Sequence, residues 1–266
     1  MQNLAIIQTL VQSLFSENLI SAWQDTLKQQ VGSLISSTKR NNIMGEALSG
    51  QTRADAAMLR QASKNVGEAE SMMSLAADSA KNIQGMLGEA GKIAAAYQAS
   101  SDASEKARLQ AQYDSIKSNI DNVVKNTSYN GIALMDGAKW GKDERVTADA
   151  AAGAGKVQIY AGRSGFDLTM SDARKSIVDP MGALSLDADD AVDTLSKLEG
   201  SAKLMGDVYT QRSTSLGGQV KSLERQAGIL DDVAANQINT GQTQSVQDML
   251  LNLALSDKGK IISGKG

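Results

Sequence analysis

One stretch of the chain carries an apolar residue at every third or fourth position, and this pattern constrains the fold more than any other feature. The spacing alternates between three and four residues without a break. The positions are Leu59, Ala62, Val66, Ala69, Met73, Ala76, Ala80, Ile83, Leu87, Ala90, Ala94 and Tyr97. Such a heptad stripe keeps one narrow side of a helix against a partner helix. The pattern predicts a long helix from near Gly45 to about Ala99, with partners supplied by the rest of the chain or by other copies of it.

A second heptad stripe lies in the C-terminal half. Its positions are Ala191, Leu195, Leu198, Ala202, Met205, Tyr209, Arg212, Leu216, Val220, Leu223, Ala227, Leu230 and Ala234. We expect the acidic residues from Asp187 to Asp190 to open this helix, at the positive end of its dipole. A calcium site there is disfavoured, because the glycine and glutamate of a standard calcium loop are missing. Arg212 is the charged member of the stripe. Its side chain either reaches out to solvent or pairs with an acid on a neighbouring helix or subunit, and we favour pairing.

Between the two stripes the sequence predicts a return helix, a tight turn and a small β-hairpin. The turn at Ser100–Ser104 offers N-cap residues. The apolar residues that follow it, at helical spacing, are Leu109, Tyr113, Ile116, Ile120 and Val123. We expect this helix to fold back on the first one. Asn130-Gly131 is a strong turn signal. Residues 157–160 and 166–170 alternate with period 2, which predicts a hairpin, and the Ala/Gly-rich residues 148–155 are expected to form a loop.

The composition removes most kinds of catalytic and metal site. Among its 266 residues the chain has no cysteine and no histidine, which excludes disulfides, thiolate nucleophiles, imidazole bases and histidine-containing metal sites. We therefore expect no enzyme, no cofactor and no metal. The net charge is −3 with mixed signs, so nothing indicates a nucleic-acid partner. No apolar run reaches the roughly 18 residues of a membrane span, and the N-terminus lacks the basic region of a conventional signal peptide.

The predicted fold class is mainly α, an elongated bundle of long coiled-coil-like helices with a small β-hairpin in the middle of the chain. Five segments make up the predicted division: 1–44, an N-terminal inner-core helix and hinge; 45–137, the N-terminal core helices; 138–186, a short hairpin and loop region; 187–238, the C-terminal core helix; and 239–266, a shortened C-terminal inner-core segment. Residues 1–40 carry a looser apolar pattern. Either they form an amphipathic helix of a bundle, or they become helical on assembly.

Four segments together resemble bacterial flagellin. Residues 60–65 (RQASKN), 109–121 (LQAQYDSIKSNID) and 126–137 (NTSYNGIALMDG) are similar to the N-terminal core of that family, and residues 211–217 (QRSTSLG) are similar to the start of its C-terminal core helix. The resemblance spans about Gly32 to Asp232. The candidate assembly and turn residues that it marks are Arg60, Gln61, Asn65, Asn126, Thr127, Tyr129, Asn130, Gly131 and Arg212.

The resemblance implies a structural subunit that polymerises into an extracellular helical flagellar filament for motility. Such a subunit is exported unfolded and uncleaved through the flagellar type III apparatus. The implied partners are further copies of the chain, hook-associated and cap proteins, the export apparatus and an export chaperone, with no nucleic acid and no membrane. Two alternatives stay open. One is a hook–filament junction protein of the same rod architecture, and the other is a secreted flagellin-like protein that does not form a standard filament.

The sequence also departs from the family pattern. Residues 40–45 (RNNIMG) replace a common motif of a basic residue, two aspartates and a glycine. About fifty residues stand in place of the variable outer domains, which implies a thin, smooth filament. In the segment that the animal innate flagellin receptor reads, Gly88 to Ile93, the family arginine falls at Glu89. Reversing the charge of a contact arginine removes pairing and adds repulsion, so we expect a poor agonist.

Overall fold

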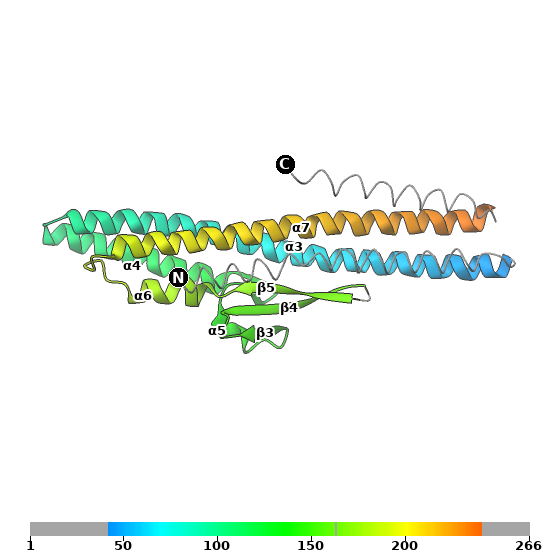
Figure 1. Ribbon diagram of the computed structural model, residues 1–266, viewed down its shortest axis with the longest axis horizontal. Helices are drawn as coiled ribbons and strands as arrows, with labels where there is room; N and C mark the ends of the chain where they lie inside the picture. Colours follow the sequence, from blue (N-terminus) through cyan, green and yellow to red (C-terminus); the bar gives the residue numbers. More distant parts are fainter. Residues whose placement is uncertain (1–41, 163, 241–266) are drawn as a thin grey trace. The chain divides into compact units, whose positions relative to one another are not determined.

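The structure, a computed structural model, describes residues 42–162 and 164–240, and the side chains of residues 49–162 and 164–235. Its elements in chain order are α3 (Asn42–Ala99), α4 (Ala103–Asn126), β1 (Ser128–Tyr129), β2 (Ile132–Ala133), α5 (Gly137–Trp140), β3 (Val146–Asp149), β4 (Ala154–Ala161), β5 (Ser164–Ser171), the π-helical turn η1 (Arg174–Val178), α6 (Asp179–Ala183) and α7 (Ala191–Thr240). Long helices dominate and the strands are short (Figure 1). This confirms the mainly α fold with a small β region. The predictions for residues 1–41 and 241–266 lie outside the described residues.

The contacts divide the chain into two units, which we describe separately. Unit 1 contains the described residues from Ala62 to Lys221, and unit 2 contains residues 42–61 and 222–240. In unit 2 the early turns of α3 bury Ala56 and Leu59, and the late turns of α7 bury residues such as Leu230. The Ser49 hydroxyl donates a hydrogen bond of 3.2 Å to the Ala234 carbonyl, which joins the two helices of this unit.

In unit 1 the two heptad stripes are the buried sides of α3 and α7. Every stripe position of α3 from Ala62 to Ala94 is buried, and Tyr97 is half-buried. The apolar stripe positions of α7 from Ala191 to Leu216 are buried as well. The helices approach closely, because a Cβ added at Gly206 would lie 3.5 Å from the Ala80 Cβ. The helix interpretation is confirmed, with α3 starting at Asn42, slightly before the expected Gly45.

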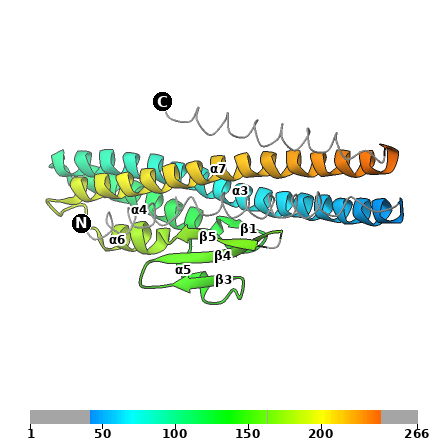
Figure 2. The same ribbon diagram turned by 45° about the vertical axis from the view of Figure 1, so that its right-hand side comes forward.

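Helix α4 runs beside α3 and α7 in both ribbon views (Figures 1 and 2). Asp102 caps it, since its side chain accepts hydrogen bonds from the backbone N–H groups of Ser104 and Glu105 at 2.7 and 3.2 Å. This confirms the predicted N-cap turn. Two positions of the predicted stripe, Ile116 and Val123, are only half-buried, and Val124 is buried in place of Val123. With 3.6 residues per turn, the buried side of a straight helix drifts from a strict heptad repeat.

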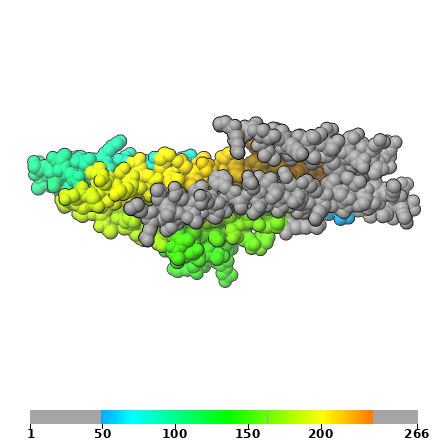
Figure 3. Space-filling view, in the orientation of Figure 1, coloured from blue at the N-terminus to red at the C-terminus, as the bar shows by residue number. Residues whose placement is uncertain are grey.

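The middle of the chain forms a three-stranded antiparallel sheet with the order β3-β4-β5. The predicted β4–β5 hairpin is confirmed, but it is longer, and β3 adds an edge strand in which Ala148 pairs with Gly155. The expected loop over residues 148–155 is therefore wrong except for its centre. Gly155 has no room for a side chain, because an added Cβ would lie 2.7 Å from an atom of the Trp140 ring. The β region contributes the green atoms that protrude at the lower side of the molecule in Figure 3.

Candidate functional site

The Asn-Gly turn closes the small β1–β2 hairpin. Tyr129 pairs with Ile132, so Asn130 and Gly131 are the two turn residues. Their φ angles are 48° and 81°. Both lie in the left-handed region, as a type I′ turn requires. The Arg145 Nη1 donates a hydrogen bond of 3.1 Å to the Asn130 carbonyl. The predicted tight turn is confirmed, and Arg145 holds its tip.

Thr127 connects this hairpin to two helices. Its buried hydroxyl donates to the Val123 carbonyl at 2.7 Å and lies 3.0 Å from the Ser79 hydroxyl. Its backbone N–H donates to the same Val123 carbonyl, and its own carbonyl accepts from the Leu134 N–H at 3.0 Å. The Thr127 hydroxyl thereby adds a second hydrogen bond to a carbonyl of the last turn of α4, which already accepts from the Thr127 N–H. Thr127 thus ties α4, α3 and the segment after the hairpin together.

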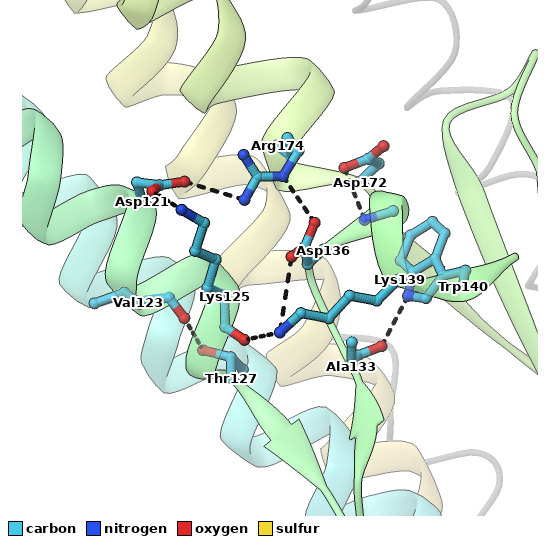
Figure 4. Close-up of polar contacts among 11 residues, drawn as sticks. Asp121, Val123, Lys125, Thr127, Ala133, Asp136, Lys139, Trp140, Asp172 and Arg174 are labelled. Atoms are coloured by element: carbon cyan, nitrogen blue, oxygen red, sulfur yellow. Dashed lines mark hydrogen bonds and ion pairs between the residues drawn. The ribbon is translucent and has the colours of Figure 1, made fainter. Parts of the chain in front are cut away.

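An ion network lies beside this joint (Figure 4). The Arg174 guanidinium donates to Asp136 at 2.8 Å through Nε and to Asp121 at 3.0 Å through Nη2. The Asp136 side chain is 3% exposed, so its charge needs a partner. Lys125 pairs with Asp121 from the next turn of α4. Lys139 lies 3.9 Å from Asp136 and donates to the Lys125 carbonyl at 2.5 Å. One arginine therefore fixes η1 to α4 and to the segment that follows β2.

The charges of this network reinforce one another. Burial alone raises the pKa of Asp121, but the hydrogen bonds from Lys125 and Arg174 outweigh burial and hold that pKa below its ordinary value of 3.8. The hydrogen bond to Asp136 is the largest contribution that raises the pKa of Arg174, and Asp121 adds to it. Asp121 and Arg174 are therefore charged at neutral pH, as a salt-bridged junction requires.

Neutral contacts complete the joint. The Trp140 indole N–H donates to the Ala133 carbonyl at 2.8 Å, which fixes α5 against β2. The Gly137 N–H donates to the Asp172 carboxylate at 3.1 Å, and so α5 is also held to the end of β5. We call Thr127, Asp121, Asp136, Arg174 and Trp140, with these partners, the turn junction.

The outer edge of β5 is covered by side chains of α7. The Ser171 N–H donates to the Tyr209 hydroxyl at 2.7 Å, and Arg212 Nη1 donates to the Thr169 carbonyl. Residues two apart on a strand present their backbone groups to the same edge. Two side chains three residues apart on α7 therefore take the place of a neighbouring strand.

Among the described residues Arg212 has no acidic partner, so the expected pairing with an acid on a neighbouring helix is not seen, and pairing with another subunit stays a prediction. Its partner is a carbonyl, its Nε is buried without a partner, and its guanidinium lies 6.0 Å from the centre of the Tyr209 ring. Burial lowers its pKa. On the other long helix, Asn65 Nδ2 donates to the Tyr160 carbonyl of β4 at 2.7 Å. Asn65 and Arg212, which are far apart in the chain, thus bind the backbone of one hairpin.

The remaining candidate residues are dispersed. Arg60 and Gln61 belong to unit 2, where Arg60 forms an ion pair with Asp231. Asn126 is the last residue of α4 and is exposed, and Tyr129 is half-buried in β1. Three further candidate residues lie on α3, where Gly88 and Ile93 are half-buried and Glu89 is exposed.

Several residues of the turn junction were missed by sequence reasoning. Asp121 and Asp136 lie inside the flagellin-like segments, so the motif itself was the available signal. Arg174, Trp140 and Asp172 lie outside any motif. Their partners are chosen by the tertiary fold, and no spacing in the sequence indicates them.

Other kinds of site find no support in the part of the chain that the structure describes. Residues 42–162 and 164–240 contain no group of three acidic, histidine or cysteine side chains that could hold a metal ion. None of the described helices has an apolar stretch long enough to cross a membrane. Among the aspartates before α7, Asp187 accepts from the Tyr97 hydroxyl at 3.2 Å and lies 3.8 Å from the Lys106 ammonium.

Comparison with known proteins gives one family match. Residues 8–140 match the family model of the bacterial flagellin N-terminal helical region. The match covers half of the chain and, within the described residues, includes α3, α4, the Asn-Gly turn and α5. A comparison with curated proteins found no match.

Proposed function

The chain belongs to the bacterial flagellin family, whose members are structural proteins, and from this we propose that it polymerises into an extracellular helical filament that serves motility. The observation that carries the proposal is the family match over residues 8–140, which include α4, the Asn-Gly turn and α5. There, motif residues such as Thr127 and Gly131 have defined structural roles. The subunit acts by stiffness and packing, without catalysis.

In this proposal, polymerisation adds to the small apolar area that the alanine-rich α3 stripe buries within one chain. Half of the α3 stripe positions are alanine, and an alanine buries little area and makes few dispersion contacts. Contacts between copies would supply further burial. In this proposal the segments 1–44 and 239–266 form an inner core on assembly, 45–137 and 187–238 form the surrounding core, and 138–186 faces outward. Export through the flagellar type III apparatus, with hook-associated, cap and chaperone partners, belongs to the same proposal.

Polymerisation of the purified full-length chain tests this function. We expect sedimentable filaments above a critical concentration, visible by negative-stain microscopy, and a monomer below it. Short closed assemblies of a few copies would instead favour the hook–filament junction protein. A chain that stays monomeric at all concentrations, also when seeded with fragments of its own native filaments, would refute the proposal.

A further inference from the structure

The long helices of unit 1 carry glycines that their packing does not require. At Gly85 and Gly91 of α3, and at Gly200 and Gly218 of α7, an added Cβ would meet no atom of the described residues within 4 Å. None of the four has a positive φ. Gly206 differs, because a Cβ there would lie 3.5 Å from the Ala80 Cβ, which gives it a packing reason. We call the first four residues the open glycines.

An open glycine weakens its helix without changing the interior of the bundle. Apart from proline, glycine is the poorest helix former, because the unfolded chain gains the most backbone freedom there. Alanine is the best helix former, and it recurs along the stripes of both helices. The open glycines therefore act against the high helix propensity of the surrounding sequence, and the buried stripes stay intact.

We propose that the open glycines keep the isolated subunit easy to unfold, so that it can be threaded through a narrow export channel. This inference rests on the proposed function, which includes export of the unfolded chain. An open glycine lowers the stability of its helix without changing the side chains that pack in the interior of the bundle. The same surface can then assemble normally, and contacts between copies stabilise the helices after export.

The test replaces all four glycines in the full-length chain. The variant is Gly85→Ala, Gly91→Ala, Gly200→Ala and Gly218→Ala. Helix propensity predicts a rise in the Tm of the monomer of roughly 8–16 °C and slower unfolding. We expect the same critical concentration for polymerisation as the unaltered chain, and several-fold less protein in the culture medium of a flagellated bacterium that expresses it.

A compensated variant separates stability from the identity of the four sites. It adds glycines at four exposed alanines of α3 and α4: Ala95→Gly, Ala96→Gly, Ala107→Gly and Ala111→Gly. We expect its Tm and its secretion to return toward those of the unaltered chain. A four-alanine variant that is stabilised but secreted normally would overturn the inference, as would an unchanged Tm. Loss of polymerisation by both variants would also overturn it, because the glycines would then be contact sites between copies.

The experiment distinguishes failure of the proposed function from failure of the inference about the open glycines. If the unaltered chain is neither secreted nor polymerises, the proposed function fails, whatever the Tm of the variants. If the unaltered chain does both, and secretion does not follow Tm across the three proteins, only the role of the open glycines fails.

Discussion

Replacing Arg174 with methionine removes the central cation of the turn junction. Arg174 bonds Asp136 at 2.8 Å and Asp121 at 3.0 Å. Methionine keeps an unbranched apolar side chain and loses the charge and the donors. Asp136, which is 3% exposed, would then retain only Lys139 at 3.9 Å. The variant therefore leaves a buried carboxylate without a close partner.

The expected destabilisation is about 3–5 kcal/mol, because breaking a buried ion pair strands the remaining charge. Asp121 adds little to this figure, since it is partly exposed and keeps Lys125. At roughly 2–4 °C per kcal/mol for a chain of about this size, the Tm should fall by roughly 6–20 °C.

The destabilisation caused by Arg174→Met should be smaller at low pH. The folded pKa of Asp121 is depressed, so its contribution is present above the unfolded pKa and is lost as pH falls through the lower folded value. The Tm difference between the unaltered chain and Arg174→Met should therefore narrow as pH falls below about 4.

Thermal unfolding followed by circular dichroism measures these differences. Arg108→Met is the matched control, because Arg108 is 55% exposed and pairs with Glu105 on the surface of α4, where an ion pair contributes little to stability. The double variant Asp136→Asn, Arg174→Met should recover at least half of the lost Tm, since no buried charge remains. The reasoning is refuted if Arg174→Met lowers the Tm no more than Arg108→Met does, or if the Tm of the double variant is no higher than that of Arg174→Met.

Three further substitutions address other parts of the molecule. Gly131→Ala forces a side chain into a φ of 81°, and should destabilise by about 1–2 kcal/mol in urea unfolding; an unchanged midpoint would contradict the type I′ turn. Tyr209→Phe removes the acceptor of the Ser171 N–H, so hydrogen exchange at that amide should speed up by about tenfold or more, and equal exchange would show that the contact does not protect it. Glu89→Arg reverses an exposed charge on α3 and should raise the response of a flagellin-receptor reporter by about tenfold, whereas an unaltered chain as potent as an ordinary flagellin would reject the expectation of a poor agonist.

The sequence was sufficient to predict the long helices and the Asn-Gly turn, but not the short helices α5, η1 and α6. A heptad stripe is a property of one segment, and it shows which side of that segment must be buried before any partner is known. The Asn-Gly turn is equally local, because few residues other than glycine and asparagine adopt a positive φ. This is why the buried positions of α3 and the turn at Gly131 were both predicted.

The contacts of the turn junction are not local in this sense. Arg174 binds partners 38 and 53 residues away in sequence, and no periodicity relates them. Arg212 shows a second difficulty, since a charged residue in an apolar stripe suggests an acidic partner, yet the structure satisfies it with a strand carbonyl. Edge strands leave such carbonyls free, and which edge meets which helix depends on the whole fold.

The way in which the sheet edges are covered bears on how copies of the chain can associate. Tyr209 and Arg212 cover part of β5, and Asn65 binds β4 beyond the end of β3. Strand β3 spans only Val146–Asp149, and short edge strands with a charged residue resist pairing with another chain. The sheet therefore offers little edge for strand pairing between copies. A polymer of this chain, as proposed, must be built chiefly through helical surfaces, so substitutions at exposed positions of α3, α4 and α7 should change its critical concentration more than substitutions on β3.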